Sequence, residues 1–513
     1  MPEEDHEKDH IDQQQVIDFL RDPASHGDHP VEHIETHISH VFLVGEKAYK
    51  LKKHLKNEFL DYSTLSLREK YCRREVDINR RLTPELYRGC MAVLRERGGF
   101  ILKPDQQLTE TDRAVEWLVE MTRFKDEEVM SHMAAQGPLS LDLIDQLAAV
   151  MARFHNSLPA DPRYGGARAM HKVRGDILSG LARQTDRLFN DSELQQWGKK
   201  LTQCYDDIGA HLDQRRAAGR VRACHGDLHL GNLCCLEGRV APFDAIEFNP
   251  ALSHIDVFYE LAFPVMDLMY FGQKTQAAYL LNRYLEQTAD YDGLAVLPAF
   301  LSLRAGVRAM VTGLISAHKA RARAREYFDL AVRLLGGGTP RLVAVGGLSG
   351  SGKSTLARHL APHIGRLPGA VILRSDVIRK QLFNVPPEQK LPPENYTREN
   401  ARRVYDRMMQ VMDQALDAGW SVIVDATFQA ETSRQDIARR ARQRGVGFSG
   451  IWLDVPAEVM RERLKGRTGD ASDADVRVLE EQLARSTGSV TWPRIPAQGT
   501  PGEILKHVLA ALH

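Results

Sequence analysis

The sequence has no excess of charge of either sign. Its 513 residues include 68 Lys and Arg against 68 Asp and Glu, so the chain is neutral before its 20 His are counted. The net charge therefore gives no support to a nucleic-acid or anionic-membrane partner. Binding to such a partner would require a local basic patch on the surface. At this length and with 43% hydrophobic residues, we expect two to four globular domains.

Long apolar runs are also missing. The longest, at 257–271, is interrupted by Glu260, Pro264 and Asp267, so it is not expected to cross a bilayer. Residues 2–12 are acidic and rich in His, without the apolar centre of a secretion signal. We therefore expect a cytoplasmic protein without a membrane partner.

Cysteine is scarce, with six residues and no C-x-x-C spacing, which indicates reduced thiols in a cytosolic protein. The seven His between residues 6 and 40 fit no set of metal ligands. Residues 1–30 are therefore expected to form a solvated, disordered leader rather than a metal site.

The strongest motif lies at 347–354, where GLSGSGKS fits G-x-x-x-x-G-K-[ST] in full. A β-branched apolar run at 341–345 precedes it and a helix-forming segment at 355–360 follows, so the loop should join a buried parallel strand to a helix N-terminus. A glycine-rich turn that binds nothing would not need both flanks. The expected nucleotide-binding residues are Gly347, Ser349, Gly350, Ser351, Gly352, Lys353, Ser354 and Thr355, with Lys353 on the β/γ-phosphates and Ser354 on Mg²⁺.

Near the N-terminus, residues 41–52 predict a β-hairpin that turns at 45–46. Side chains alternate along a strand, so Ala48 and Lys50 share a face that suits an adenine ring and its phosphates. The plain alternative is a lysine on an exposed strand face. A second hairpin is expected to turn at 97–99, and 115–121 predicts a further strand.

A helix is expected between these hairpins, opened by a capping box at 66–69 and stopped by Pro84. Its apolar stripe consists of Leu67, Tyr71, Ile78 and Leu82. Glu75 falls inside this stripe, and a carboxylate on a packed face needs a cation because an unpaired buried charge is costly. Lys50 is the expected partner, and the alternative is an edge carboxylate paired within the helix to Arg74 or Arg81. A later amphipathic helix, 141–158, should begin at Ser140 as its N-cap.

The segment CHGDLHLGN at 224–232 leads into a predicted hairpin of 233–236 and 239–244. A hairpin centred on Gly238 would place Asn232 opposite Asp244, with Asp227 just before the open end. Two carboxylates and an amide at one loop mouth suit Mg²⁺ together with a spare base. The alternative is a polar loop beside a hairpin.

Lys50, Glu75, the H-G-D-L-H-x-x-N run at 225–232, and Asp244 resemble the aminoglycoside phosphotransferase-like branch of the protein-kinase-like fold. The resemblance implies an α+β bilobal domain over 31–335. In it Lys50 holds the α/β-phosphates, Glu75 orients Lys50, Asp227 is the base, and Asn232 and Asp244 hold Mg²⁺. The first hairpin lacks G-x-G-x-x-G, and Ala-Ile-Glu follows Asp244 where kinases have Phe-Gly. Nothing identifies an antibiotic as the substrate.

A glycine-rich linker at 336–340 should separate this half from an α/β domain at 341–513. Strands are expected at 370–373, 421–425 and 451–455. Asp376 and Arg379 share a helix face after one strand, where we expect a catalytic carboxylate and a substrate-binding arginine. Asp425 ends another strand and is expected to ligate Mg²⁺ opposite Ser354.

Arginines at 461–467 precede a polar segment at 469–473 that is expected to be a mobile lid. Arg463 and Arg467 are expected to neutralise the transferring phosphoryl group, and solvated helix arginines are the alternative. This half resembles small-molecule P-loop kinases, the group with gluconate kinase-like, zeta-toxin-like and polynucleotide 5′-kinase enzymes. The resemblance implies an α/β P-loop NTPase fold with a parallel sheet.

The sequence therefore predicts a bifunctional ATP- and Mg²⁺-dependent phosphotransferase, with Asp227, Asp376 and Lys353 as catalytic residues and small hydroxylated acceptors as substrates. One alternative makes one domain, preferably the N-terminal one, a nucleotide-binding regulator of the other. Another makes the C-terminal domain a nucleic-acid end kinase, which the neutral charge disfavours. The acceptors, the choice of ATP or GTP and the oligomeric state stay open.

Overall fold

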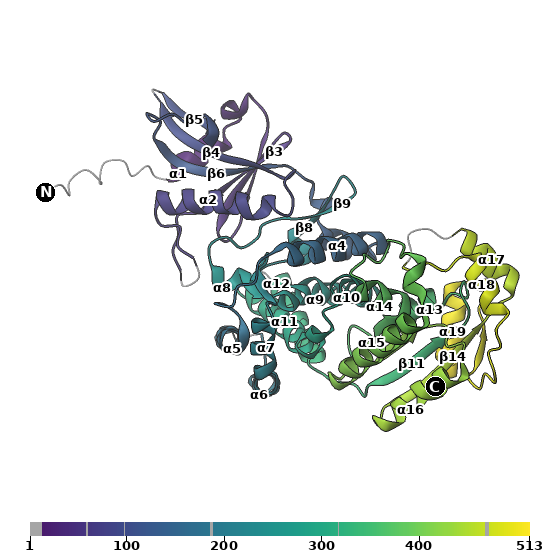
Figure 1. Cartoon of the computed structure of the whole chain (residues 1–513). Coiled ribbons are helices and arrows are strands. Elements are labelled where there is room, and N and C mark those ends of the chain that lie inside the picture. Colours follow the sequence, from purple (N-terminus) through teal and green to yellow (C-terminus); the bar gives the residue numbers. More distant parts are fainter. Residues whose placement is uncertain are drawn as a thin grey trace. The chain divides into compact units, whose positions relative to one another are not determined.

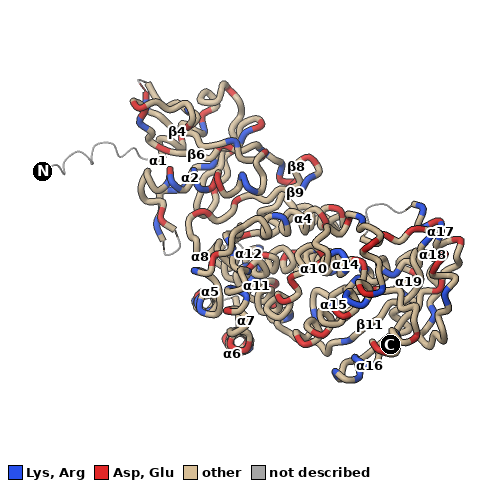
Figure 2. Tube along the Cα trace, viewed as in Figure 1, with Lys and Arg blue, Asp and Glu red and all other residues tan. Residues whose placement is uncertain are grey.

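The computed structural model describes residues 13–57, 60–96, 98–184, 188–315, 318–466 and 471–512. They form two compact units (Figure 1). The first unit draws on Met1–Gly137, Ser157–Gly165 and Ala218–Glu260, and the second on Pro138–Asn156, Gly166–Ala217 and Leu261–His513. Basic and acidic residues are interspersed along the described chain, as its neutral composition leads us to expect (Figure 2).

The first unit is built on a six-stranded sheet in the order β1-β2-β3-β6-β4-β5, in which all neighbours are antiparallel. The strands are β1 (Val31–Glu35), β2 (Ser39–Val44), β3 (Lys47–Lys52), β4 (Tyr87–Glu96), β5 (Gly99–Pro104) and β6 (Ala114–Thr122). Both predicted hairpins and the predicted strand at 115–121 are confirmed, although Arg97 of the second turn lies outside the described residues.

Two helices cover the two faces of this sheet. Helix α1 (Gln13–Arg21) packs its apolar side on Phe42, Leu51 and Leu118, and α2 (Leu65–Arg80) packs on the face that carries Ala48. The prediction of a disordered leader is therefore wrong from residue 13 onward, because the apolar residues of α1 share one helix face and are buried. Residues 1–12 of that leader lie outside the described part of the chain.

Helix α2 begins earlier and is rotated relative to the prediction. Thr64 is the N-cap and accepts a hydrogen bond from the Leu67 N–H at 3.2 Å, so the capping box at 66–69 is wrong. The buried face of α2 consists of Arg68, Cys72, Glu75, Val76 and Asn79. Three residues of the predicted apolar stripe, Leu67, Tyr71 and Ile78, are only half-buried. Buried polar partners such as Glu116, which binds Arg68, shift the packed face away from the apolar pattern.

Short elements complete the first unit. They are α3 (Met130–Gln136), α8 (Pro250–Ser253), the antiparallel pair β7 (Val221–Ala223) and β10 (His254–Asp256), and the hairpin β8 (Leu233–Leu236) and β9 (Arg239–Pro242). In the hairpin, Leu233 pairs with Pro242, so Asn232 lies opposite Phe243 and not opposite Asp244 as predicted. The register is shifted because Glu237 and Gly238 form a two-residue turn with φ of 50° and 77°, which centres the hairpin between them.

Helices lead into the second unit. They are α4 (Leu141–Ser157), α5 (Gly166–Ala182), α6 (Asp191–Asp207), α7 (Gly209–Ala217), α9 (Val257–Tyr270), α10 (Lys274–Thr288), α11 (Leu297–Gly313) and α12 (His318–Leu334). The Ser140 hydroxyl accepts from the Leu143 N–H at 3.2 Å, which confirms the predicted N-cap of α4. Among the described residues, every helix is too short or too polar to cross a membrane.

The same unit contains a parallel sheet in the order β12-β13-β11-β14-β15. Its strands are β11 (Arg341–Gly346), β12 (Val371–Arg374), β13 (Val422–Asp425), β14 (Gly447–Asp454) and β15 (Arg494–Pro496). The accompanying helices are α13 (Lys353–Leu360), α14 (Ser375–Leu382), α15 (Arg398–Asp417), α16 (Glu431–Gln443), α17 (Ala457–Lys465), α18 (Val476–Leu483) and α19 (Pro501–Leu512).

The predicted α/β fold with a parallel sheet is thus confirmed, and the short strand β15 was not predicted. Helices α10–α12 belong to the same compact unit as this sheet. The division into domains at 31–335 and 341–513, joined by a linker at 336–340, therefore stays a prediction about which pieces fold independently.

Candidate active sites

In the first unit, Lys50 on β3 lies against Glu75 on α2. The Lys50 Nζ donates to Glu75 Oε1 at 2.8 Å, and both side chains are buried. The predicted ion pair is therefore confirmed. Lys50 also donates to Asp244, whose side chain is 44% exposed and follows β9 in a left-handed conformation. The structure thus brings three of the predicted site residues together at one ammonium group.

A second lysine on the same face of β3 was missed. Lys52 Nζ donates to Glu75 Oε2 at 2.6 Å and also to Glu247, so Glu75 binds one lysine with each carboxylate oxygen. The Tyr62 hydroxyl donates to Glu247 Oε1 at 2.5 Å. The sequence contained the signal for Lys52, because side chains two positions apart on a strand lie on the same face of the sheet.

The charges of this cluster explain its protonation states. Burial alone would lower the pKa of Lys50 and of Lys52, but the neighbouring carboxylates outweigh it and raise both pKa values well above the ordinary range. Partial burial would raise the pKa of Asp244, yet the Lys50 ammonium outweighs it and lowers this pKa below its usual value. Burial does raise the pKa of Glu247, in spite of Lys52. Two lysines, Lys50 and Lys52, therefore face the three carboxylates of Glu75, Asp244 and Glu247.

The loop at 225–232 places Asp227 and Asn232 next to each other. The Asn232 amide donates to the Asp227 carbonyl at 2.9 Å and to Asp227 Oδ2 at 3.1 Å. Because its nitrogen serves Asp227, the amide oxygen is the atom left to ligate a cation. An amide oxygen and the half-exposed carboxylate of Asp244 are donors that suit Mg²⁺. The roles of Asp227, Asn232 and Asp244 as base and metal ligands stay predictions.

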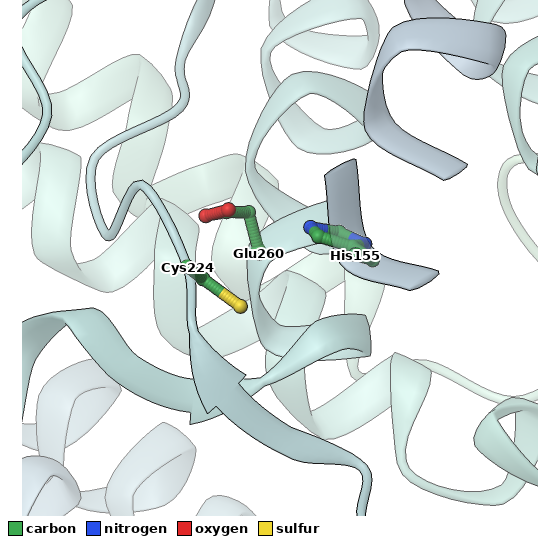
Figure 3. A group of neighbouring side chains, drawn as sticks. All are labelled: His155, Cys224 and Glu260. Atoms are coloured by element: carbon green, nitrogen blue, oxygen red, sulfur yellow. The ribbon is translucent and has the colours of Figure 1, made fainter. Parts of the chain in front are cut away.

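Glu260 on α9 supports this loop and was not predicted. Its two carboxylate oxygens accept from the N–H groups of His225 at 2.8 Å and Gly226 at 3.0 Å. Figure 3 shows Glu260 beside the start of the loop, next to Cys224. Gly226 has φ of 90°, and a Cβ there would lie 2.9 Å from the Leu252 carbonyl, so only glycine fits. The sequence offered a signal for Glu260, because Glu260 and Asp267 are carboxylates inside a mainly apolar helix.

In the second unit, the loop 347–352 joins β11 to α13 as expected. Gly347 and Gly350 have φ of 146° and 82°, and a Cβ on Gly350 would lie 2.7 Å from the Met460 carbonyl. Gln482 on α18 holds the loop, since it accepts from the Ser349 N–H at 2.8 Å and donates to Ser349 Oγ at 3.0 Å. Lys353 donates to the Leu348 carbonyl at 2.9 Å. The residues predicted to bind nucleotide therefore share one glycine-shaped loop and the first turn of α13.

Ser354 and Asp425 are brought together at the carboxyl edge of the sheet. Ser354 Oγ donates to Asp425 Oδ2 at 2.5 Å, and the Asp425 carboxylate is buried. Burial raises its pKa, while Lys353 and Arg374 act in the opposite direction. A hydroxyl and a carboxylate at hydrogen-bond distance are an oxygen pair that suits a divalent cation. Their function as metal ligands stays a prediction.

The remaining predicted residues lie around this loop. Arg463 on α17 donates to the carbonyls of Ser351 at 3.5 Å and Ala497 at 2.9 Å. Arg379 and Asp376 lie on α14, and the Arg379 guanidinium packs 4.8 Å from the ring centre of Tyr396. Arg467 lies outside the described residues, as do residues 469 and 470 of the predicted lid.

The predicted lid is anchored at its end. Asp473 accepts from Lys380 at 3.0 Å, from the Leu391 N–H at 2.9 Å and from the Tyr396 hydroxyl at 2.5 Å. These contacts hold Asp473 beside the segment that follows α14. The roles of Asp376, Arg379 and Arg463 in catalysis and binding stay predictions.

Two family models match the chain. Residues 72–297 match the phosphotransferase enzyme family, and residues 342–488 match an AAA domain. An uncharacterized protein of Mycobacterium tuberculosis is 27% identical over 475 residues, which cover 91% of this chain and 92% of that protein. An adenylyl-sulfate kinase of Myxococcus xanthus is 29% identical over 142 residues, 28% of this chain and 69% of that protein. The solved choline kinase of Cryptosporidium parvum is 11% identical with a TM-score of 0.39, covering 63% of this chain and 95% of that one.

Proposed function

We propose that this kinase, in which a domain of the phosphotransferase enzyme family precedes a P-loop kinase domain, transfers the γ-phosphoryl group of ATP at two separate sites. The observation that carries the proposal is the presence of two sets of phosphate-transfer residues. Each combines a lysine with a carboxylate and a second oxygen ligand. These are the groups that phosphoryl transfer requires, because its catalysis is mainly positioning and charge stabilisation.

At the first site, Glu75 binds Lys50. This ion pair supports a role for Lys50 in binding the α/β-phosphates of ATP. Asn232 and Asp244 would hold Mg²⁺, which neutralises the phosphate charge. Asp227 accepts the proton of the acceptor hydroxyl at its carboxylate. The acceptor oxygen then forms a bond to the γ-phosphorus as the bond to ADP breaks.

At the second site, the N–H groups of the 347–354 loop and Lys353 bind the phosphates of ATP. Ser354 and Asp425 would hold Mg²⁺. Asp376 accepts the proton of the acceptor, and Arg379 binds the acceptor. Arg463, which lies beside the loop, and Arg467 balance the charge of the transferring group.

Small hydroxylated molecules are the acceptors that we propose for both sites. The similarity of the second domain to an enzyme named for adenylyl sulfate favours a small molecule over a nucleic-acid end. A regulatory first domain would need metal ligands but no base. The half-exposed Asp227 carboxylate, which accepts a hydrogen bond from Asn232, favours catalysis there.

The test is ADP release by the full chain on a panel of hydroxylated metabolites that includes a 5′-hydroxyl oligonucleotide. Asp227→Asn should abolish transfer to one group of acceptors, and Lys353→Ala should abolish transfer to another. If Asp227→Asn changes transfer to none of them while the first site still binds nucleotide, the first domain is regulatory. Transfer to the oligonucleotide that is lost in Lys353→Ala would make the second domain an end kinase.

A further inference from the structure

Helix α10 lies along the free edge of the parallel sheet. Strand β12 ends the strand order, and among the strands of the described residues it pairs with β13 alone. On its other side, Asn282 of α10 accepts from the Ile372 N–H at 2.7 Å and donates to the Ala370 carbonyl at 3.1 Å. A buried amide that binds strand backbone in this way satisfies groups that an edge strand leaves without partners. The contacts fix α10 in register with β12.

One turn further along α10, Glu286 reaches the end of β12. Its Oε1 lies 3.7 Å from Nη1 of Arg374, the last residue of that strand. The Nε of Arg374 lies 3.7 Å from Asp425 Oδ2, the same oxygen that accepts from Ser354. Glu286, Arg374 and Asp425 are 4%, 3% and 4% exposed. A buried line of alternating charge thus runs from α10 to the P-loop serine.

Glu286 is itself held in place from two directions. Its Oε2 accepts from Arg283, which also contacts Asp145 and Glu388. Gln381 on α14 donates to the Glu286 carbonyl at 2.9 Å, which ties the end of α10 to the helix that follows β12. The Glu286 carboxylate therefore faces Arg374 from a fixed position.

We propose that Arg374 is a positioning residue for Asp425, and that Glu286 holds Arg374 so that Asp425 can bind the metal. A buried arginine beside one buried carboxylate would close on it and neutralise it. Here Glu286 and Asp425 each lie 3.7 Å from the Arg374 guanidinium, farther than a hydrogen bond. The negative charge of Glu286 therefore opposes closure of Arg374 on Asp425, which leaves the Asp425 carboxylate available to Mg²⁺.

The proposal couples the two parts of the chain. Helix α10 lies within the segment that matches the phosphotransferase family, whereas Arg374 and Asp425 lie within the P-loop segment. The proposed metal site of the P-loop segment therefore depends on a helix from the segment that matches the phosphotransferase family. This inference rests on the proposed function of the P-loop site.

The experiment measures Mn²⁺ binding by electron paramagnetic resonance in the full chain, with a non-hydrolysable ATP analogue present. All variants carry Asp244→Asn, which removes a proposed metal ligand of the first site. Glu286→Gln should weaken Mn²⁺ binding roughly tenfold, as loss of an outer partner of a metal ligand does. Affinity for the analogue without metal should not change. Glu388→Gln is the matched control, because Glu388 also binds Arg283 but is half-exposed, and it should leave Mn²⁺ affinity unchanged.

A double-mutant cycle tests whether Glu286 acts through Arg374. In an Arg374→Met background, Glu286→Gln should have no further effect on Mn²⁺ binding. Unchanged Mn²⁺ affinity in Glu286→Gln overturns the proposal. An effect that persists without Arg374, or an equal loss of analogue affinity with and without metal, overturns it too.

Two measurements keep the result decisive. If Glu286→Gln does not fold, Glu286→Asp is measured instead and should weaken Mn²⁺ binding by a smaller factor. A Glu286→Asp variant that binds Mn²⁺ as tightly as the parent overturns the proposal. Lys353→Ala tests the proposed function separately, because it should abolish the metal–nucleotide signal of this site. If the parent has no signal that depends on Lys353, the proposed function fails; if parent and Glu286→Gln bind equally, only the inference fails.

Discussion

Replacing each of the two buried lysines of β3 should affect a different property: Lys52 mainly stabilises the fold, and Lys50 mainly binds nucleotide. Lys52 is 1% exposed and is shared by the buried carboxylates of Glu75 and Glu247. Lys52→Met leaves Glu247 without its ammonium partner, and breaking a buried pair in this way costs about 3–5 kcal/mol. In Lys50→Met, Glu75 keeps Lys52 as its partner, and water can solvate the half-exposed carboxylate of Asp244. The Lys50→Met substitution should therefore lower the free energy of unfolding by only about 1–2 kcal/mol.

Nucleotide affinity should show the opposite order. Lys50→Met removes the proposed phosphate contact and should weaken ATP binding at the first site by roughly tenfold or more, since charge-assisted contacts are strong. Lys52→Met should leave that affinity unchanged, because the Lys52 ammonium is buried and bound by the carboxylates of Glu75 and Glu247. The two variants make the same substitution two residues apart on one strand face, so each is the control for the other.

The assay combines two readouts on the full chain. Hydrogen exchange of the β3 and α2 amides reports the local opening free energy of the sheet. Calorimetry in a Lys353→Ala background reports nucleotide binding at the first site. If both variants lower local stability equally and weaken ATP binding equally, the division of roles between Lys50 and Lys52 is refuted.

Three further predictions concern single residues. Glu260→Gln leaves one of the two buried N–H groups at the start of the 225–232 loop poorly satisfied, at a cost of about 1–3 kcal/mol. Steady-state kinetics should show a larger loss in kcat at the first site than in nucleotide affinity. Gly350→Ala should abolish nucleotide binding at the P-loop in calorimetry, because strain at positive φ costs about 1–3 kcal/mol and the Cβ would meet the Met460 carbonyl. The hydrogen bond to Asp292 is the main cause of a raised pKa of His211 in the folded chain. Protonated His211 therefore stabilises the fold fully below the unfolded pKa of about 6.5, and this contribution is lost as the pH rises through the higher folded pKa. Urea unfolding at several pH values should show this loss, below about 1 kcal/mol for a partly exposed pair, and His211→Asn should remove it.

Local patterns carried the parts of the site that were predicted. The P-loop is a contiguous motif whose flanks are a strand and a helix, so its geometry follows from neighbouring residues. The Lys50–Glu75 pair crosses two elements, but a carboxylate on a packed helix face has to find a cation, and β3 offered one. The same reasoning applied one step further along the strand would have found Lys52.

Distant partners and turn geometry carried the parts that were missed. Glu247 lies 195 residues from Lys52, and no local pattern joins them. The offset between Asn232 and Asp244 comes from the left-handed backbone of Glu237, an ordinary residue in a conformation that composition does not reveal. In the sequence nothing distinguishes Asn282 from the other polar residues at 274–288, and its role appears only when α10 lies beside β12.

The central claim, two nucleotide sites in one chain, is tested most directly by the stoichiometry of binding. Equilibrium dialysis of the full chain with Mg²⁺ and a non-hydrolysable ATP analogue should give two bound nucleotides per chain. Lys353→Ala and Lys50→Met should each reduce this to one, and the double variant should bind none. A single nucleotide in the parent chain, or the loss of both through one substitution, would contradict the account.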